Sequence, residues 1–222
     1  MTRRVRRHAN PFSCKVELGM LDRMALFGRE APLEIELGPG NASFLFDRAR
    51  ACPETDFVGI EVRKPMVDQA MERRERLGLK NAVVLYGNAN VNLKGLVSPS
   101  IVKCFHVHFP DPWVKKRHWK RRMVQPQLIR DMAELLDIGG QIYAQSDVPN
   151  LAKEMYYFFS EDGSFDSLLD PSMLVERPIP EFTDWEKHHE DIGEPIYRML
   201  FEKARVAEGP VPELEHQEAE LK

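Results

Sequence analysis

Short apolar runs alternate with amphipathic stretches along most of this chain. The apolar runs are rich in β-branched and aromatic residues, have the length of β-strands, and lead into polar or turn-forming residues. The predicted strands cover residues 33–37, 57–61, 82–86, 101–109 and 141–146.

Between these runs the apolar residues follow helical spacing. Asn41 is a good N-cap for a helix that Pro53 ends, and Pro65 lies near the start of the next helix. A third helix carries its apolar residues on one face from residue 124 onward and is ended by Gly139-Gly140. A fourth helix is predicted over about 149–160.

Strand–helix alternation over about 110 residues predicts a doubly wound α/β fold, a mostly parallel sheet with helices on both faces. Residues 172–177 and 195–203 follow as a predicted final pair of strands. In such sheets, ligands bind beyond the carboxyl ends of the strands. The residues that follow each strand are therefore the first candidates for a functional site.

Charge is unevenly distributed, although the whole chain has a net charge of only −4. Residues 205–222 carry five Glu against one Arg and one Lys and lack apolar periodicity, so we predict a disordered acidic tail. Residues 1–12 form a basic N-terminal arm. Residues 13–204 then make up one domain, for which the hydrophobic content of 43% supplies a core.

Other features argue against several classes of protein. No apolar run approaches the length of a membrane span, and the N-terminus lacks the apolar region of a secretory signal. Cys14, Cys52 and Cys104 are scattered without metal-binding spacing, which is typical of reduced thiols. We therefore expect a cytoplasmic protein without a bound metal, and we leave open whether it is a monomer or a homodimer.

The first strand leads into a loop in which Gly38 and Gly40 permit a tight turn and a close approach by a ligand. The pattern G-x-G-x-x-G is incomplete because Ser43 stands at its last position, so a simple strand-to-helix turn fits equally well. Glu36 precedes the loop. Its carboxylate would repel a pyrophosphate, whereas it suits a cationic ligand such as a sulfonium with an amino-acid group.

The second and third strands also end in polar residues. Glu61 lies at the distance from the glycine loop at which an acid accepts hydrogen bonds from ribose hydroxyls, with a surface Glu as the alternative. Asn88 can bind an adenine edge, with Ala89 allowing close approach, although an ordinary Asn turn is favoured for it in isolation. Together with Glu36, these residues predict a pocket for S-adenosylmethionine rather than for a dinucleotide.

The fourth strand leads into "FPDPWVKKRHWKRR", where two prolines flank Asp111 and fix its backbone. The densest positive charge of the chain follows. Cations can neutralise phosphates, and Trp113 and Trp119 can stack on unpaired bases, whereas a solvated basic surface is the alternative. The residues that we expect to contact nucleic-acid phosphates are Lys116, Arg117, Lys120, Arg121 and Arg122.

This stretch resembles the signature of the bacterial tRNA (guanine-N7-)-methyltransferases. The segments "IELGPGNASF", "GIEV" and "GNA" are similar to the S-adenosylmethionine motifs of that family. "HANPF", "QSDVPNL" and "TDWEKHHEDIGEPIY" resemble other segments of it, so that the likeness covers roughly residues 8–203. Ala42 departs from the family pattern, which usually has a third Gly there, and Gln145-Ser146 before Asp147 is also unusual.

The resemblance implies a class I S-adenosylmethionine-dependent methyltransferase with a Rossmann-like, mostly parallel, seven-stranded sheet. It implies methylation of N7 of a guanine in tRNA, at position 46 of the variable loop. The expected cofactor contacts are Glu36, Gly38, Gly40, Glu61, Asn88, Ala89 and Asp111, and Asp111 is also the expected catalytic residue. The substrate contacts that it implies are Lys115, Asp147, Thr183, Asp184, Trp185 and Glu186.

Several of these residues have purely structural alternatives. Asp147 is also a candidate N-cap for the helix that follows, and T-x-x-E from Thr183 to Glu186 is the signature of a capping box. His106 and His108 alternate with apolar residues, which is typical of packed strand histidines. The pair His188-His189 is expected on an exposed helix, and no His is assigned to catalysis.

Two other functional classes remain open. A nucleotide-dependent oxidoreductase can have the same fold, but Glu36 and the incomplete glycine pattern count against it. A non-catalytic RNA-binding protein would need only the basic residues and not Asp111. Methyl transfer to guanine N7 is chemically consistent with the carboxylates, because that atom has a lone pair and no proton and needs alignment and charge stabilisation.

Overall fold

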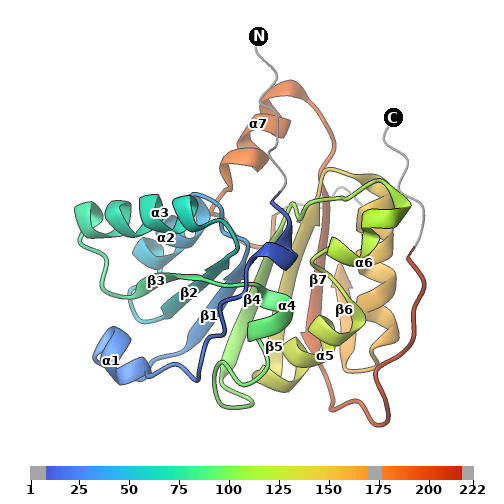
Figure 1. Ribbon diagram of the computed structural model, residues 1–222, viewed down its shortest axis with the longest axis horizontal. Helices are drawn as coiled ribbons and strands as arrows, with labels where there is room; N and C mark the ends of the chain where they lie inside the picture. The colour runs from blue at the N-terminus through green and yellow to red at the C-terminus, as the bar shows by residue number, and fades with distance from the viewer. Residues whose placement is uncertain (1–8, 170–176, 217–222) are drawn as a thin grey trace.

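The computed structural model describes residues 9–169 and 177–216, which form a mixed seven-stranded sheet in the order β3-β2-β1-β4-β5-β7-β6 (Figure 1). The strands are β1 (Leu33–Leu37), β2 (Asp56–Glu61), β3 (Ala82–Tyr86), β4 (Val102–His108), β5 (Leu136–Ser146), β6 (Phe165–Leu169) and β7 (Tyr197–Lys203). Strands β1 to β5 pair in parallel, and β7 is antiparallel to both of its neighbours. The predicted α/β fold is confirmed.

The helices cover both faces of the sheet. They are η1 (Pro11–Ser13), α1 (Arg23–Phe27), α2 (Ser43–Ala51), α3 (Lys64–Leu77), α4 (Ala89–Asn92), η2 (Lys116–Arg121), α5 (Pro126–Leu135), α6 (Pro149–Glu161) and α7 (Asp184–Ile192). Helices α2 and α3 pack on β2 and β3, whereas α4, α5 and α6 cover the other face. Figure 1 shows α7 standing apart from these layers, at the top of the view. None of the helices within the described ranges is long and apolar enough to cross a membrane.

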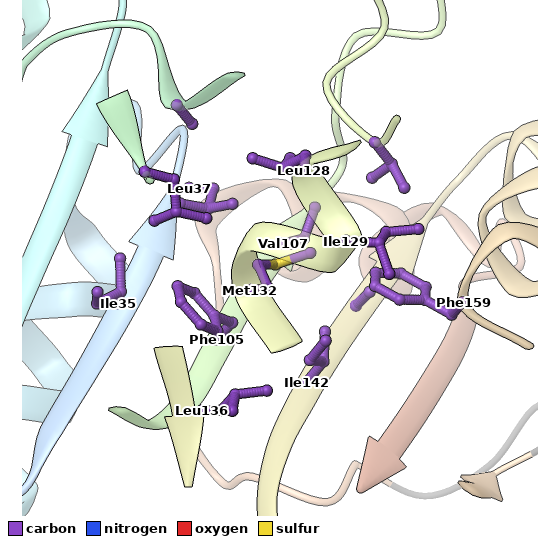
Figure 2. Close-up of a cluster of buried hydrophobic side chains, with 14 of the residues drawn as sticks. Ile35, Leu37, Phe105, Val107, Leu128, Ile129, Met132, Leu136, Ile142 and Phe159 are labelled. Atoms are coloured by element: carbon purple, nitrogen blue, oxygen red, sulfur yellow. The ribbon is translucent and has the colours of Figure 1, made fainter. Parts of the chain in front are cut away.

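The two faces of β1 and β4 differ in chemistry because successive side chains of a strand point to opposite faces. Ile35, Leu37, Phe105 and Val107 face α5, where they join Leu128, Ile129 and Met132 in the main hydrophobic core (Figure 2). The alternate residues of the same strands are Glu34, Glu36, His106 and His108, and all four are buried. A buried row of acids and histidines therefore lies on the face of the sheet that α2 covers.

The end of α5 differs from the prediction. The helix ends at Leu135 and β5 begins at the next residue, so Gly139-Gly140 lies inside an irregular part of β5 and is no helix C-cap. A Cβ atom on Gly140 would lie 2.8 Å from the carbonyl oxygen of Asp137, which explains why glycine is needed at this bend.

The predicted final strand pair is only partly tested. Strand β7 starts two residues later than predicted, and its outer partner is β6, a strand that the sequence analysis did not predict. The predicted strand over 172–177 falls almost wholly outside the described residues, because the structure does not describe 170–176.

The two chain ends are only partly described. Residues 1–8 and 217–222 lie outside the described part. Residues 205–216 have no regular secondary structure, but Leu214 packs against the core and His216 Nδ1 lies 3.1 Å from Glu154 Oε1. An apolar residue and a His within the acidic sequence therefore contact the domain, while the disordered acidic tail over 205–222 stays a prediction.

Candidate functional site

A cavity of about 470 Å³ opens at the carboxyl ends of β1, β2 and β4, where the fold predicts a ligand. Its lining includes every predicted cofactor residue, namely Glu36, Gly38, Gly40, Glu61, Asn88, Ala89 and Asp111. Of the predicted substrate residues, Thr183, Asp184 and Trp185 also line it, whereas Lys115, Asp147 and Glu186 lie outside the lining. The structure thus brings most of the predicted site together, although a contact with a ligand stays a prediction.

The glycine loop owes its shape to left-handed backbone conformations. Gly38 and Gly40 have φ angles of 75° and 60°, which glycine adopts without steric cost. Ala42, with a φ of 57°, occupies the N-cap position of α2, where the sequence analysis expected Asn41. Asn41 Oδ1 instead accepts a hydrogen bond from the backbone N–H of Ser43. The side chain one residue earlier thus satisfies the first turn of the helix.

Glu61 ties the glycine loop to the end of β2. Its Oε2 accepts hydrogen bonds from the Gly40 N–H at 2.9 Å and from Arg63 Nη2 at 3.0 Å. Its Oε1 accepts from the backbone N–H and Nε of Arg63, and these hydrogen bonds raise the pKa of Arg63. Glu61 is therefore no ordinary surface Glu, while its contact with ribose hydroxyls stays a prediction.

Asn88 forms the turn that its sequence suggested. It is the N-cap of α4, where Oδ1 accepts from the N–H of Asn90 at 3.1 Å, while Nδ2 donates to the carbonyl of Pro11 at 3.2 Å. Pro11 and Ala9 line the cavity as well. The described end of the predicted basic arm therefore belongs to the site, held there by Asn88.

The loop that carries Asp111 has an unusual backbone. Phe109 and Trp113, on either side of the Pro110–Pro112 segment, have φ angles of 47° and 42°. Bulky residues rarely adopt positive φ, and such strain is found mainly where a functional site requires it. Asp111 lines the cavity and is half-buried. The two prolines restrict the backbone on either side of Asp111, and the positive φ angles beside them mark this loop as a candidate functional segment.

Arg122 corrects one prediction. It is 1% exposed, its Nε donates to the carbonyl of Pro112 at 2.8 Å, and its Nη1 lies 2.5 Å from Glu154 Oε2. A side chain so deeply buried does not reach a phosphate in this structure. Because Pro112 directly follows Asp111, Arg122 instead anchors the Asp111 loop and the end of η2 to α6.

The remaining basic residues form what we call the basic turn, Lys115–Arg121. Lys115, Lys116, Arg117 and Lys120 lie on its outer side, whereas Trp119 is buried and unavailable for stacking on a base. Arg121 is half-buried, lines the cavity, and holds its guanidinium 5.1 Å from the centre of the Trp113 ring. The basic turn therefore reaches from solvent to the mouth of the cavity.

The first turn of helix α7 lines the cavity. The predicted capping box is present, since Thr183 Oγ1 accepts from the Glu186 N–H at 3.0 Å and Glu186 Oε2 accepts from the Thr183 N–H. Glu186 is 1% exposed and paired with Arg198 Nη2 at 2.7 Å, so it faces the protein interior. Asp184 Oδ2 accepts from Asn41 Nδ2 at 2.5 Å, which joins α7 to the glycine loop.

Asp147 and His189 form a second link to α7. Asp147 Oδ2 accepts from Trp185 Nε1 at 3.0 Å and lies 3.4 Å from His189 Nε2. Asp147 is not a helix N-cap, because Val148 has that position and the Ser146 hydroxyl accepts from its N–H. His189 is 5% exposed, so the expectation of an exposed histidine pair holds only for His188.

Two residues that line the cavity, Arg63 and His108, were not predicted from the sequence. His108 lines the cavity, and its Nδ1 lies 3.2 Å from Glu36 Oε1. A signal was present, because the strand alternation that places Glu36 on the α2 face places His108 there as well. No pattern in the sequence indicated that Arg63 folds back onto Glu61.

A family model described as "Putative methyltransferase" matches residues 30–199. The tRNA (guanine-N(7)-)-methyltransferase of Trichormus variabilis is 37% identical over 206 residues, which are 90% of this chain and 96% of the relative. The enzyme of that name from Thermosynechococcus vestitus is 38% identical, over 93% of this chain and 98% of the relative.

Solved structures support the fold at lower sequence identity. The 16S rRNA methyltransferase KamB matches with a TM-score of 0.56 and 16% identity, over 84% of this chain and 97% of that chain. An rRNA methylase from Streptococcus thermophilus matches with a TM-score of 0.53 and 15% identity, over 79% and 89%. On sequence, the chain belongs to the tRNA (guanine-N(7)-)-methyltransferase family.

Proposed function

We propose that this protein transfers a methyl group from S-adenosylmethionine to N7 of a guanine in tRNA, at position 46 of the variable loop. The observation that carries the proposal is a cavity whose lining joins the glycine loop and its acids to Asp111 and to Arg121 of the basic turn. A cofactor pocket and an RNA-binding surface therefore share one opening.

The residues of the cavity fit S-adenosylmethionine. Its sulfonium supplies an electrophilic methyl group. Glu36 is 2% exposed and has one buried oxygen, Oε2, without a hydrogen-bond partner among the described residues, which suits a cationic ligand with N–H donors. Gly38 and Gly40 allow close approach of the ligand, and Glu61 is placed for the ribose.

The proposed chemistry asks little of the protein beyond alignment and charge stabilisation. Guanine N7 has no proton to remove, but the ring gains positive charge as the methyl group arrives. Asp111, flanked by two prolines, is the carboxylate that we assign to stabilising this charge and holding the base in line. Thr183, Asp184 and Trp185 border the same space and are the substrate contacts that the geometry supports best.

The tRNA backbone binds the basic turn in this proposal. Lys116, Arg117 and Lys120 are exposed beside the cavity mouth, where they can neutralise phosphates. Arg121 bridges this surface and the cavity. The local field at the opening attracts the RNA even though the whole chain carries a net charge of −4.

The cell compartment and the assembly state belong to the same proposal. Cys14, Cys52 and Cys104 are free in the structure, as expected for a reducing compartment. We place the protein in the cytoplasm, where tRNA is its partner, and expect it to act as a monomer or a homodimer.

Incubation of the full chain with unmodified transcribed tRNA and methyl-labelled S-adenosylmethionine, followed by nucleoside analysis, tests the proposal. We expect labelled 7-methylguanosine, and a substrate with adenine in place of the target guanine should remain unlabelled. Absence of 7-methylguanosine from every tRNA tried would rule out the proposed reaction. Label at a guanine elsewhere in the tRNA would keep the chemistry but reject position 46.

A further inference from the structure

Two Glu–His pairs lie side by side on the α2 face of the sheet. Glu34 Oε2 lies 2.8 Å from His106 Nε2, and Glu36 Oε1 lies 3.2 Å from His108 Nδ1. In each pair the His lies two residues beyond the residue of β4 that is in register with the Glu. The two pairs therefore share residue types and burial, and they differ in what surrounds them.

Both side chains of the inner pair, Glu34–His106, are buried and contact other residues of the protein. Arg48 donates to both carboxylate oxygens of Glu34, from Nη2 to Oε1 and from Nε to Oε2, each at 3.1 Å. His106 is 0% exposed, and neither Glu34 nor His106 lines the cavity. This pair has an arginine as its third member, so its role is to hold the sheet and α2 together.

The outer pair, Glu36–His108, lines the cavity and has no third member among the described residues. Glu36 Oε2 and His108 Nε2 are both buried, and neither has a hydrogen-bond partner in the described part of the chain. Burial has removed their hydrogen bonds to water, so both atoms gain from a polar ligand. Arg48 pairs with Glu34, whereas no Lys or Arg among the described residues pairs with Glu36, and a ligand cation suits that position.

We infer that His108 is a positioning residue for the methyl donor, because it holds the carboxylate of Glu36, the acid assigned above to the cationic end of that donor. A carboxylate only accepts hydrogen bonds, so the Nδ1 that faces Glu36 is the donor, and it fixes the rotamer of the Glu36 side chain. The ammonium of the amino-acid end supplies N–H donors and a positive charge to the acceptors that remain. This inference rests on the proposed use of S-adenosylmethionine.

The surroundings of His108 support this role. The Phe44 ring packs edge-on against it with ring centres 4.3 Å apart, and Tyr143 contacts it with ring centres 5.3 Å apart. Aromatic rings on α2 and β5 therefore restrict the imidazole, which can transmit a fixed orientation to Glu36. A residue held in this way acts through its neighbour and takes no part in bond making.

The test compares His108→Phe, which keeps the ring and loses both nitrogens, with His108→Asn, whose amide can replace the Nδ1 donor. Calorimetry gives Kd for S-adenosylmethionine and for 5′-methylthioadenosine, which lacks the amino-acid end. We expect His108→Phe to weaken S-adenosylmethionine binding by about tenfold, leave methylthioadenosine binding unchanged, and be largely rescued in His108→Asn. If His108→Phe does not fold, His108→Leu, which also lacks both nitrogens, replaces it in the same comparison.

Two further measurements separate positioning from a structural effect. His106→Phe, the matched control, should lower the Tm and leave both Kd values unchanged. In a Glu36→Gln background, His108→Phe should cause little further loss, because the two residues act as one unit. Equal losses for both ligands, unchanged binding of both, or additive effects of the two changes would overturn the inference. A wild-type chain that binds neither ligand would instead refute the proposed function.

Discussion

The cavity and the basic turn lie next to each other, but the protein holds them in different ways. The cavity is built on strand ends, and its acid Glu61 holds the glycine loop through a hydrogen bond from a backbone N–H. The basic turn is a short segment, mostly 3-10 helix, in which all the Lys and Arg residues except Arg121 face solvent, and the buried Trp119 and Arg122 hold it to the domain. Rigid strand ends suit alignment of a reaction, whereas an anchored surface turn suits binding of a backbone that has no single shape.

Replacement of Asp111 should give the largest difference between an effect on methyl transfer and an effect on tRNA binding. We expect Asp111→Ala to lower the rate of methyl transfer by at least about 100-fold, because the carboxylate opposite the developing charge is lost. Binding of tRNA should change little, since the exposed cations are intact. Single-turnover rates and filter binding measure the two effects. Asp68→Ala, on an exposed part of α3, is the matched control, and equal loss of binding and rate in Asp111→Ala would contradict this division.

Breaking the ion pair between Arg122 and Glu154 should lower the free energy of unfolding and so affect both regions. Glu154→Ala leaves Arg122 buried without its carboxylate partner, which costs about 3–5 kcal/mol of unfolding free energy. Urea denaturation measures this loss. The double variant Glu154→Met with Arg122→Met should recover much of it, because an apolar pair of similar volume carries no uncompensated charge. If Glu154→Ala alone were as stable as the wild type, the pair would not be an anchor.

Arg122 also shows how far the sequence could be used for prediction. Strand ends were predictable because apolar alternation and turn residues are local signals, and the fold then brought together Glu36, Glu61 and Asp111. Which of two neighbouring arginines enters the interior was not predictable. The burial of Arg122 depends on Glu154, a residue 32 positions away on another helix, and no local pattern specifies that distance.

The placement of other side chains also depends on long-range contacts. Asp147 and Glu186 have partners on another element, Trp185 and Arg198, and their contact with a substrate stays a prediction. His108 was missed because an alternating histidine fits a packed strand as well as a ligand site. Long-range partners decide such cases, and a single sequence does not contain them.

Removing only the exposed charge should have a smaller and different effect. We expect Lys116, Arg117 and Lys120 changed together to Ala to weaken tRNA binding. The slope of log K against log salt should fall by about 0.7–0.9 for each phosphate that the variant no longer neutralises. The rate with saturating tRNA should remain near the wild-type value, since the cavity is untouched.

The control for this variant removes the same amount of charge elsewhere. Lys80, Lys94 and Lys103 lie outside the basic turn, on other parts of the surface, so their joint change to Ala should leave the salt slope unaltered. Equal slopes for the two triple variants would mean that the basic turn is only a solvated surface.

The smallest expected effect concerns the inner Glu34–His106 pair and its contribution to stability. Burial lowers the pKa of His106 below its ordinary value of 6.5, although the hydrogen bond to Glu34 opposes this. The unfolded chain therefore binds the proton more readily, and stability is lost as the pH falls below about 6.5. Burial acts to raise the pKa of Glu34, but its hydrogen bonds with His106 and Arg48 lower it overall. Its stabilising contribution is lost only in more acid solution, below its unfolded value of about 4.5.

The two pH windows allow the inner pair to be tested without disturbing the site. Between about pH 7 and pH 5, the Tm of His106→Asn should fall less than that of the wild type, because the substituted residue does not titrate. His188→Asn, which changes an exposed histidine, should follow the wild-type curve. Binding of S-adenosylmethionine to His106→Asn at pH 7 should be unchanged, since that pair does not line the cavity. A parallel Tm curve for His106→Asn would show that the protonation of His106 does not limit acid stability.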